Sequence, residues 1–443
     1  MILVYVDKIT NRLGYILNLI LKDILGIEYT ITTNRENFAN HIGAKFSYCK
    51  NRVKDEPFIY STDLLFETTI EIKDLEVFYF EENPAIFRTY AKDSIIPFDV
   101  LAASFYFVSR YEEYLPFIQD KHGRYRYEES LAFQNCFLHK PIVNIWVKNL
   151  GEKLKGIYPD LEFAKHYFRF YNTIDIDSAY SFKEKGMFRK LYGFAKDFFK
   201  GNLSECGYRF NVIFRGKTDP YDNFDYQISL IKKYKLKTIY FILFGRYGKY
   251  DKNISPYNKR FHRLIKYLCD YAKVGIHPSY SSFDQEEELS VQIKELEQVI
   301  HKPILRSRFH FLRFRLPISY RRLLDNMISD DYSMGYSKTI GFRAGICSGY
   351  NFFDLEIDGE TKLRVHPFAI MDVALKDGLG LNKEEALIKI KQIVDEIIAV
   401  KGDFISVWHN QSLSERYQWI GWREVYENML EYVSAVDRTP FEQ

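Results

Sequence analysis

The chain has 443 residues, more than one ordinary hydrophobic core supports, and this length predicts two domains. Its 47% apolar and 27% charged residues are typical of a globular protein. Its 62 basic and 59 acidic side chains leave a net charge of +3, which excludes an overall electrostatic attraction to nucleic acid or to an anionic membrane. No apolar run approaches the ~20 residues of a membrane-spanning helix, so we expect no membrane span.

Aromatic residues are unusually frequent, with 35 Tyr and 37 Phe. They are spread along the whole chain, which favours core packing over a surface for stacking sugars. The five cysteines are never spaced as C-x-x-C, and this indicates reduced thiols in a cytoplasmic protein. The apolar residues 1–7 lack a basic lead and a small-residue cleavage site, so we expect a first strand there and not a signal peptide.

The first predicted domain covers residues 1–160. Runs at 2–6 and 71–80 are typical of strands, and apolar residues at helical spacing predict a helix over 11–25. We therefore expect a smaller α/β or α+β domain. Its polar, aromatic stretch at 109–114 is interpreted as a helix end followed by a turn. His122, Glu112 and Glu113 are either part of a surface between the domains or a solvated face.

The second predicted domain covers residues 161–443, where short apolar runs alternate with longer amphipathic segments. This alternation predicts strands joined by helices, as in a parallel sheet or barrel. Ligands of such folds bind beyond the C-terminal ends of the strands. No glycine-rich phosphate loop occurs at these ends. The expected strands are 168–174, 238–244, 273–276, 363–365 and 404–407, and the clearest helices are 284–300 and 383–400.

Two aspartates one residue apart, Asp175 and Asp177, end the first of these strands. Alternation along an extended strand points both side chains to the same face. Two carboxylates held so close are costly unless a cation or a shared proton compensates them, so the pair indicates a metal, a general base or both. Asp is also frequent where a strand passes into a loop or a helix N-cap, and this structural explanation stays open.

Two histidines stand at the expected ends of later strands. His277 follows the run at 273–276, and His310 lies at the exit of a further expected strand at 305–309. One carboxylate and two neutral imidazoles make a three-ligand set that leaves coordination positions open, as a hydrolytic Zn²⁺ needs for its water. A single histidine at a strand end is more often structural, but two beside an aspartate pair favour a site.

Three further residues are candidates from their position. Glycines on both sides of Arg343 let the backbone turn tightly and aim the guanidinium; the alternative is a turn with an exposed Arg. His366 follows the expected strand at 363–365, and His409 follows the last one at 404–407. A late strand-end histidine suits general acid catalysis because its pKa lies near the working pH, although a structural role remains open for each.

The order of these motifs resembles the polysaccharide deacetylase superfamily, carbohydrate esterases (family 4-like) whose catalytic domain is a distorted (β/α) barrel. The resemblance covers about residues 165–415. Members have a strand ending in two aspartates, a His-containing metal motif, an Arg motif and a late strand ending in a catalytic His. The residues in these places are Asp175 and Asp177, His277, Arg308 or Arg343, and His409.

The stretches 275–280, 341–345 and 366–368 look more specifically like a bacterial subgroup with an additional, poorly characterised N-terminal domain, and 109–114 is similar to a stretch of that domain. Two departures stand out. The family's aspartates are adjacent, whereas Ile176 separates them here. The family's second metal histidine corresponds to Ser281, a poor Zn²⁺ ligand, so we expect His310 to replace it.

The resemblance implies hydrolysis of an acetyl group on an acetylated sugar or polysaccharide precursor, with a divalent metal as cofactor and Zn²⁺ as the expected ion. In that reaction Asp177, His277 and His310 hold the metal. The base is Asp175, the acid is His409, and Arg308 or Arg343 orients the base. Two alternatives remain: an amidase acting on another non-peptide C–N bond, and an inactive carbohydrate-binding or scaffold protein that kept the barrel.

Overall fold

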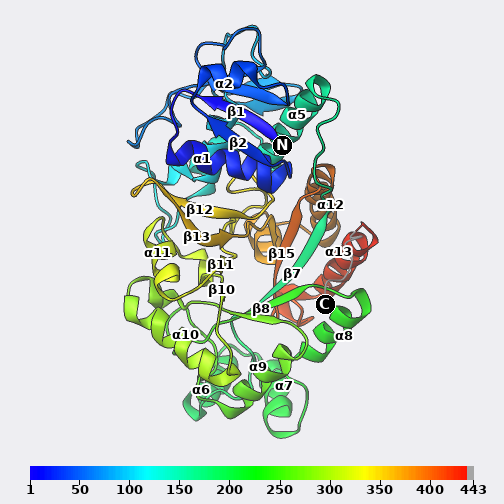
Figure 1. The fold of residues 1–443 in the computed structure, drawn as a ribbon. Helices are drawn as coiled ribbons and strands as arrows, with labels where there is room; N and C mark the ends of the chain where they lie inside the picture. Colours follow the sequence, from blue (N-terminus) through cyan, green and yellow to red (C-terminus); the bar gives the residue numbers. More distant parts are fainter. Residues whose placement is uncertain (437–443) are drawn as a thin grey trace.

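The computed structural model describes residues 1–436 and is a mixed α/β protein with two main sheets (Figure 1). The last seven residues of the second predicted domain, 437–443, lie outside this described part. A four-stranded sheet from the start of the chain lies at one end of the molecule, and a nine-stranded sheet occupies its centre (Figure 1). Within residues 1–436 no helix is both long and apolar enough to cross a bilayer.

The smaller sheet is parallel, in the order β2-β1-β3-β4. Its strands are β1 (Ile2–Val6), β2 (Tyr29–Thr32), β3 (Lys45–Cys49) and β4 (Phe58–Tyr60), and a separate hairpin contains β5 (Phe78–Phe80) and β6 (Asn83–Ala85). The helices of this part are α1 (Asn11–Leu17), α2 (Arg35–Asn40), α3 (Val100–Val108), α4 (Leu131–Gln134) and α5 (Ile142–Ile157). The expected mixture of helices and strands is confirmed.

The larger sheet has the order β12-β13-β11-β10-β9-β8-β7-β15-β14. Every neighbouring pair is parallel except β12 and β13, which are antiparallel. Its strands are β7 (Arg169–Ile176), β8 (Thr238–Ile242), β9 (Lys273–Ile276), β10 (Arg306–Ser307), β11 (Asp330–Asp331), β12 (Tyr350–Asp354), β13 (Gly359–Val365), β14 (Ile370–Met371) and β15 (Asp403–His409).

Helices connect these strands, as the alternating pattern predicts. They are α6 (Met187–Phe199), α7 (Leu203–Phe214), α8 (Phe224–Tyr234), α9 (Lys259–Cys269), α10 (Glu286–Ile300), α11 (Ile318–Asp325), α12 (Lys383–Ala399) and α13 (Trp422–Val436). The five cysteines all lie in the described part and are free, as expected. The pairing is a linear order that begins at β12 and ends at β14, so it establishes an α/β sheet and leaves the barrel as an expectation.

Three elements differ from their predictions. Of the expected strand at 71–80, only Phe78–Phe80 forms a strand. Charged residues dominate the rest of this segment, and the backbone N–H of Glu71 donates to the Tyr111 hydroxyl and not to a neighbouring strand. The predicted helix at 11–25 is α-helical to Leu17 and continues as a π-helix over Asn18–Ile24. The expected strand at 305–309 is reduced to the two residues of β10.

The N-terminal part packs on the β12–β13 hairpin through α1. The Tyr15 hydroxyl donates to the backbone carbonyl of Asn351 at 2.7 Å, and its ring lies 5.1 Å from that of Phe353. Arg12, whose side chain is fully buried, pairs with Asp358 at 2.7 Å. In Figure 1, α1 lies directly above this hairpin. The chain's first helix is therefore fixed to the edge of the large sheet.

A second connection is a buried ion cluster around Glu113. Helix α3 ends at Val108, and Arg110 follows with the left-handed φ of 55°. The Glu113 carboxylate accepts from Arg110 at 2.8 Å and from Arg343 at 2.8 and 2.7 Å. Glu112, Glu113 and His122 are all buried, so the solvated-face alternative is wrong. Glu113 and His122 bond to residues of the second part, Arg343 and Tyr280.

We expect Glu113→Ala to lower the free energy of unfolding by about 3–5 kcal/mol, because it leaves two buried guanidinium groups without their carboxylate. Urea unfolding followed by far-UV circular dichroism measures this. The matched control is Glu128→Ala, which removes a half-exposed carboxylate 3.5 Å from Arg126 and should change stability by less than about 1 kcal/mol. Equal effects of the two variants would contradict the assignment.

The pH dependence of stability has a specific source in Asp331 of β11. Burial raises the pKa of this carboxyl group to about 6, although Ser333 and the Tyr320 hydroxyl donate to it. A folded-state pKa above the ordinary ~3.9 means that stability is lost as pH rises from about 4 through about 6, by about 3 kcal/mol. In Asp331→Asn this loss should disappear in urea titrations between these pH values; an unchanged slope would assign it to other groups.

Candidate metal centre

The predicted site residues gather where several parallel strands end side by side. Strands β10, β9, β8, β7 and β15 are consecutive neighbours in the sheet. Because they run in the same direction, their C-terminal ends form one edge. Asp175 of β7 is the register partner of His409 of β15, and Ile176, Ile242 and Ile276 stand level across β7, β8 and β9. The residues that follow these positions therefore meet.

Asp177, His277 and His310 come together at this edge. One ligand atom of each lies within 4.8 Å of those of the other two. The Nε2 atom of His277 is 3.3 Å from Oδ1 of Asp177, and the Nε2 atom of His310 is 3.6 Å from its Oδ2. Both imidazoles are buried. Asp175 lies on the same face, with Oδ2 3.9 Å from Nε2 of His277, as strand alternation predicts.

Hydrogen bonds fix which nitrogen of each imidazole is available. Nδ1 of His277 lies against the backbone carbonyl oxygen of Arg308, which can only accept, so this nitrogen carries the proton. Nδ1 of His310 is 2.9 Å from a carboxylate oxygen of Asp251, which favours the same tautomer. The unprotonated Nε2 atoms of both rings then face Asp177. This is the usual outer support of metal-binding histidines.

The donor set fits a cation. The buried Oδ1 atom of Asp177 has no hydrogen-bond partner among the described residues. Two imidazole lone pairs aimed at a carboxylate repel it unless a proton or a metal ion lies between them. Two nitrogens and one oxygen also suit Zn²⁺, whose bonds of about 2.0–2.1 Å place tetrahedral neighbours roughly 3.3 Å apart.

The pKa shifts of these side chains also indicate that the site favours positive charge. Burial disfavours the charged forms, but the neighbouring groups outweigh it. The imidazoles of His310 and His409 hold the pKa of Asp177 well below its usual range. Asp177 and Asp251 raise the pKa of His310 to about 9. Metal binding at such a site competes with protons for the same nitrogen atoms, so metal affinity should fall as the pH is lowered.

Asp175 is held by Arg308. The Nη1 atom of this fully buried arginine donates to Oδ1 of Asp175 at 2.8 Å, and its Nε donates to the backbone carbonyl of Tyr332 at 2.9 Å. The guanidinium lies 4.5 Å from the centre of the Phe241 ring. These three contacts fix the guanidinium of Arg308, which in turn holds Oδ1 of Asp175. The other carboxylate oxygen, Oδ2, faces His277.

His409 completes the edge of the site from β15. Its Nδ1 atom is 2.8 Å from Oδ1 of Asp372. The other oxygen of this carboxylate, Oδ2, accepts from the backbone N–H of His409 and from the Ser412 hydroxyl. Its Nε2 atom points to Asp177, 3.8 Å from Oδ2. Burial alone lowers the pKa of His409, but Asp372 and Asp177 raise it to about 10, so the ring is protonated near neutral pH.

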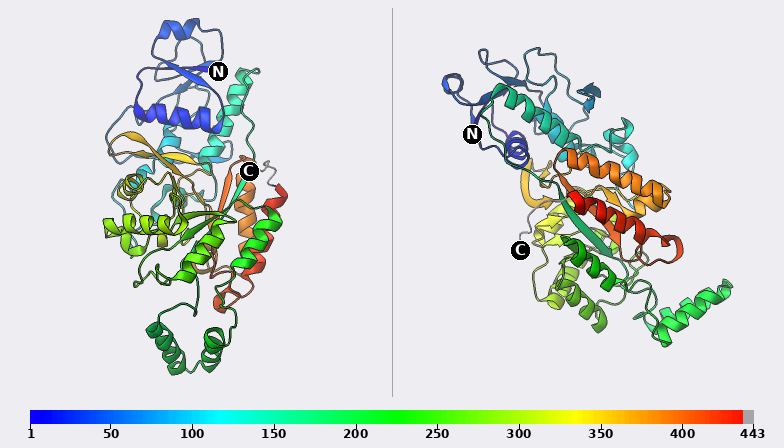
Figure 2. Two further views of the ribbon diagram at one scale, coloured as in Figure 1. Left: turned by 60° about the horizontal axis from the view of Figure 1, so that its bottom comes forward. Right: turned by 90° about the vertical axis from the view of Figure 1, so that its right-hand side faces the viewer.

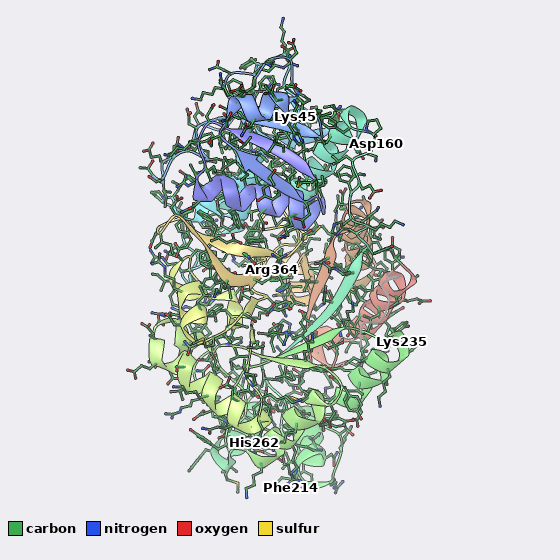
Figure 3. All side chains as sticks on the ribbon, viewed as in Figure 1. Lys45, Asp160, Phe214, Lys235, His262 and Arg364 are labelled. Atoms are coloured by element: carbon green, nitrogen blue, oxygen red, sulfur yellow. The ribbon has the colours of Figure 1, made fainter. Side chains whose placement is uncertain are left out.

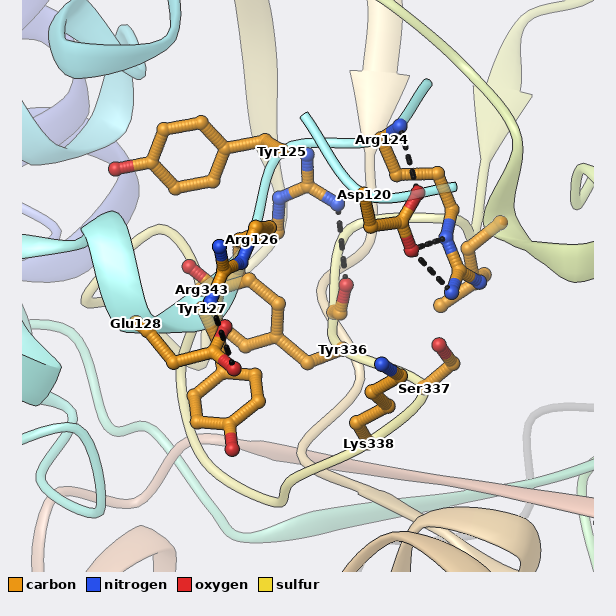
Figure 4. A pocket seen from close by; sticks show the side chains of 12 residues that line it. Asp120, Arg124, Tyr125, Arg126, Tyr127, Glu128, Tyr336, Ser337, Lys338 and Arg343 are labelled. Atoms are coloured by element: carbon orange, nitrogen blue, oxygen red, sulfur yellow. Dashed lines mark hydrogen bonds and ion pairs between the residues drawn. The ribbon is translucent and has the colours of Figure 1, made fainter. Parts of the chain in front are cut away.

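Arg343 lies elsewhere. Its guanidinium hydrogen-bonds with Glu113 and with the backbone carbonyl of Gly335, and among the described residues it has no hydrogen bond with Asp175. Figure 4 shows Arg343 beside Tyr125 and Tyr336, at a cavity of about 30 Å³, the size of one water molecule. Of the two arginines predicted to orient the base, Arg308 is thus the one in position, and Arg343 joins the two parts of the chain.

His366 is also outside the site. Its Nε2 atom is 2.7 Å from Asp330, and its ring stacks on Tyr332 with centres 4.4 Å apart. It borders a cavity of about 910 Å³ that is also lined by Arg169 and Asp403, the first residues of β7 and β15. That cavity therefore lies at the opposite ends of the strands from the candidate metal ligands.

Two supporting residues escaped the sequence analysis. Asp251 lies in the loop after β8, and Asp372 directly follows β14, so both obey the strand-end rule that identified the other residues. Reading the residues after 238–244 in the same way would have pointed to Asp251. Nothing in the sequence marks the two-residue strand before Asp372. Ser281, at the place of the family's second histidine, hydrogen-bonds with the Ser279 hydroxyl at 3.0 Å.

Comparison with known proteins gives limited matches. Residues 2–159 match the model of a family of unknown function (DUF7033), and no curated protein matches the chain. A solved structure from Mycobacterium smegmatis, assigned to the polysaccharide deacetylases, has 13% identity and a TM-score of 0.41 over 62% of this chain and 86% of its own. A probable polysaccharide deacetylase from Pseudomonas aeruginosa PAO1 has 10% identity and a TM-score of 0.41, over 63% and 88%.

A further solved structure is that of a CE4 family pseudoenzyme from Bacillus anthracis. It has 12% identity and a TM-score of 0.31 over 60% of this chain and 61% of its own. At such values a likeness identifies neither the activity nor the substrate of this protein.

We expect the protein to bind about one Zn²⁺ per chain, and His277→Ala or His310→Ala to weaken binding at least about 100-fold, since each removes one of three protein ligands. Competition with a chromophoric chelator and elemental analysis measure this. His301→Ala, which removes an exposed imidazole at the end of α10, is the control and should keep wild-type affinity. Unchanged affinity in His310→Ala would exclude this ligand set.

Proposed function

We propose that the protein is a metal-dependent hydrolase that removes an acetyl group from an acetylated sugar or polysaccharide precursor. The observation that supports it most is the orientation of the two imidazoles: each has Nδ1 engaged and Nε2 aimed at Asp177. Asp177, His277 and His310 are the metal ligands, and Zn²⁺ is the ion that this set suits best. Three protein ligands leave room for water and substrate.

The proposal includes the architecture. Residues 161–443 form the catalytic domain, a distorted (β/α) barrel whose parallel strands bring their C-terminal ends to the site. Residues 1–160 form an accessory domain, which agrees with the range 2–159 of the family model. The free cysteines support a cytoplasmic location. The choice of an acetylated carbohydrate as substrate rests on the order of motifs that resembles the polysaccharide deacetylases.

In the proposed reaction, water attacks the acetyl carbonyl carbon and the bond from this carbon to the sugar nitrogen or oxygen breaks. The metal, when bound, supplies a Lewis acid that polarises the carbonyl and makes the water more acidic. Asp175 accepts the proton of the attacking water through the oxygen that Arg308 does not hold. Arg308 fixes the carboxylate in this position, so the base is aligned before the substrate arrives.

His409 supplies the second proton transfer. Its Nε2–H faces the site, while Asp372 holds Nδ1 and thereby the orientation of the ring. A proton donated from Nε2 to the departing nitrogen or oxygen releases the free amine or hydroxyl, and acetate is the other product. The base, Asp175, and the acid, His409, are register partners on the adjacent strands β7 and β15. Both side chains can therefore contact the same scissile bond.

We expect Asp175→Asn and His409→Ala to lower kcat for acetate release by about 10²–10⁴-fold while the Zn²⁺ content stays at the wild-type level. Acetate released from N- and O-acetylated oligosaccharides is measured with zinc-loaded protein. Asp160→Asn, which changes an exposed carboxylate far from the site, is the control (Figure 3).

Two results would overturn the proposal. Ring opening of cyclic amides without acetate release from any acetylated sugar would identify an amidase. Binding of oligosaccharide without turnover by the zinc-loaded protein would identify an inactive carbohydrate-binding protein.

A further inference from the structure

The helices α6 and α7 form a hairpin that stands away from the body of the protein. Both lie between β7 and α8, so the hairpin is inserted after the strand that carries Asp175. Figure 2 shows it projecting beyond the other helices in both views, and Figure 3 places Phe214, its last residue, at the opposite end of the molecule from Lys45. It has one long side with no neighbour in the described structure.

The free side of α6 is apolar. Its exposed residues recur at helical spacing and form one stripe, about 140° wide at 3.6 residues per turn. Phe188 and Phe199 near the two ends are 88% and 86% exposed. Single exposed apolar residues are ordinary, but a continuous aromatic stripe is not. Its members are Met187, Phe188, Leu191, Tyr192, Ala195, Phe198 and Phe199.

Helix α7 adds a second stripe. Leu203, Phe210 and Phe214 are exposed and stand at positions i, i+7 and i+11, with Gly207 between them, so they share one face. Phe210 and Phe214 contact each other with ring centres 5.0 Å apart. Each helix of the hairpin thus carries an exposed apolar stripe.

The stripe is separate from the face that holds the hairpin together. Asp197 of α6 accepts from Arg209 of α7 at 3.0 and 2.5 Å, and the same guanidinium lies over Gly193, where a side chain would collide with it. At the base of the hairpin, Glu205 pairs with Arg416 at 2.6 Å. These contacts hold the two helices together and fix the base of the hairpin. The side chains of the apolar stripe of α6 take no part in them.

The same segment is strongly basic. Between Lys183 and Lys217, nine Lys and Arg side chains stand against three Asp and Glu, although the whole chain is nearly balanced. Lys196 borders the apolar stripe of α6, Lys200 stands at the C-terminal cap of the same helix, and both are exposed. Neither has a carboxylate partner within residues 1–436, nor does Arg215 at the end of α7. Long basic side chains at the margin of an apolar face can extend their charges into a layer of anions.

We propose that the α6–α7 hairpin is a docking element for the surface of an anionic lipid bilayer. An apolar aromatic face flanked by Lys and Arg is the pattern of helices that lie in the membrane interface. A second copy of the chain fits less well, because pairing two such faces would bring like charges together. The hairpin follows the C-terminal end of β7 in sequence, so docking would turn that end of the sheet toward the membrane. The proposal does not depend on the deacetylase activity.

The test is binding of the full chain to phosphatidylglycerol-containing vesicles by co-sedimentation, at low salt. The triple variant Phe188→Ser/Phe199→Ser/Phe214→Ser should bind on the order of tenfold more weakly or not at all. Lys196→Glu/Lys200→Glu should weaken binding by a similar factor, and 0.5 M salt should reduce it for the wild type. Matched controls with substitutions of exposed residues elsewhere are Ile42→Ser/Tyr79→Ser/Tyr90→Ser and Lys8→Glu/Lys92→Glu, which should bind as the wild type.

A second measurement locates the contact. The four natural tryptophans are buried, so Phe199→Trp introduces an exposed reporter on the stripe. Brominated lipids should quench its fluorescence and leave that of the wild type unchanged. The proposal is overturned if the chain does not bind anionic vesicles, if the triple serine variant binds them as the wild type does, or if the stripe instead causes dimerisation without vesicle binding.

Discussion

The site depends on the way in which two neighbouring carboxylates are neutralised in a buried place. Asp175 and Asp177 point to the same side of β7, and each would cost several kcal/mol if it stayed charged without a partner. Arg308 compensates the first, and the cation proposed between His277, His310 and Asp177 compensates the second. Because each aspartate has its own partner, the pair does not need to share a proton, and the two can serve different purposes.

Much of the site was predictable because parallel strands deliver their final residues to one edge. This rule selected Asp177, His277 and His310, and the structure brings them together. It could not choose between Arg308 and Arg343, because sequence does not say how far each loop carries a guanidinium. For the fold, periodicity identified long amphipathic elements such as α10 and α12. Strands of two residues, such as β11 and β14, are too short to show an alternation of apolar and polar residues, so the sequence did not predict them.

The N-terminal part and the part that carries the candidate metal centre are joined by buried charge and not only by apolar contact. Glu113 pairs with Arg343 across the boundary between the two parts. If the two parts shifted relative to each other, the carboxylate would move away and leave the buried guanidinium groups of Arg110 and Arg343 uncompensated, so the ion cluster favours a single arrangement of the two parts. The glycines two residues before and after Arg343 predicted a tight turn that aims the guanidinium. In the structure the guanidinium is aimed at Glu113 of the N-terminal part. The interpretation as an active-site residue rested on these glycines and on the motif order, and neither shows what the guanidinium contacts.

The packing of α1 on the β12–β13 hairpin also has a consequence for handling the protein. Strand β12 is the last strand at its end of the large sheet, and an edge of this kind presents unpaired backbone groups that can recruit the strand of another molecule. The Tyr15 hydroxyl donates a hydrogen bond to one of these groups, the backbone carbonyl of Asn351, and the Tyr15 ring packs on the nearby Phe353. The N-terminal part thus works as an edge cap: a truncated chain that begins at β7 would carry an open, aggregation-prone strand, and the two parts need to be produced together.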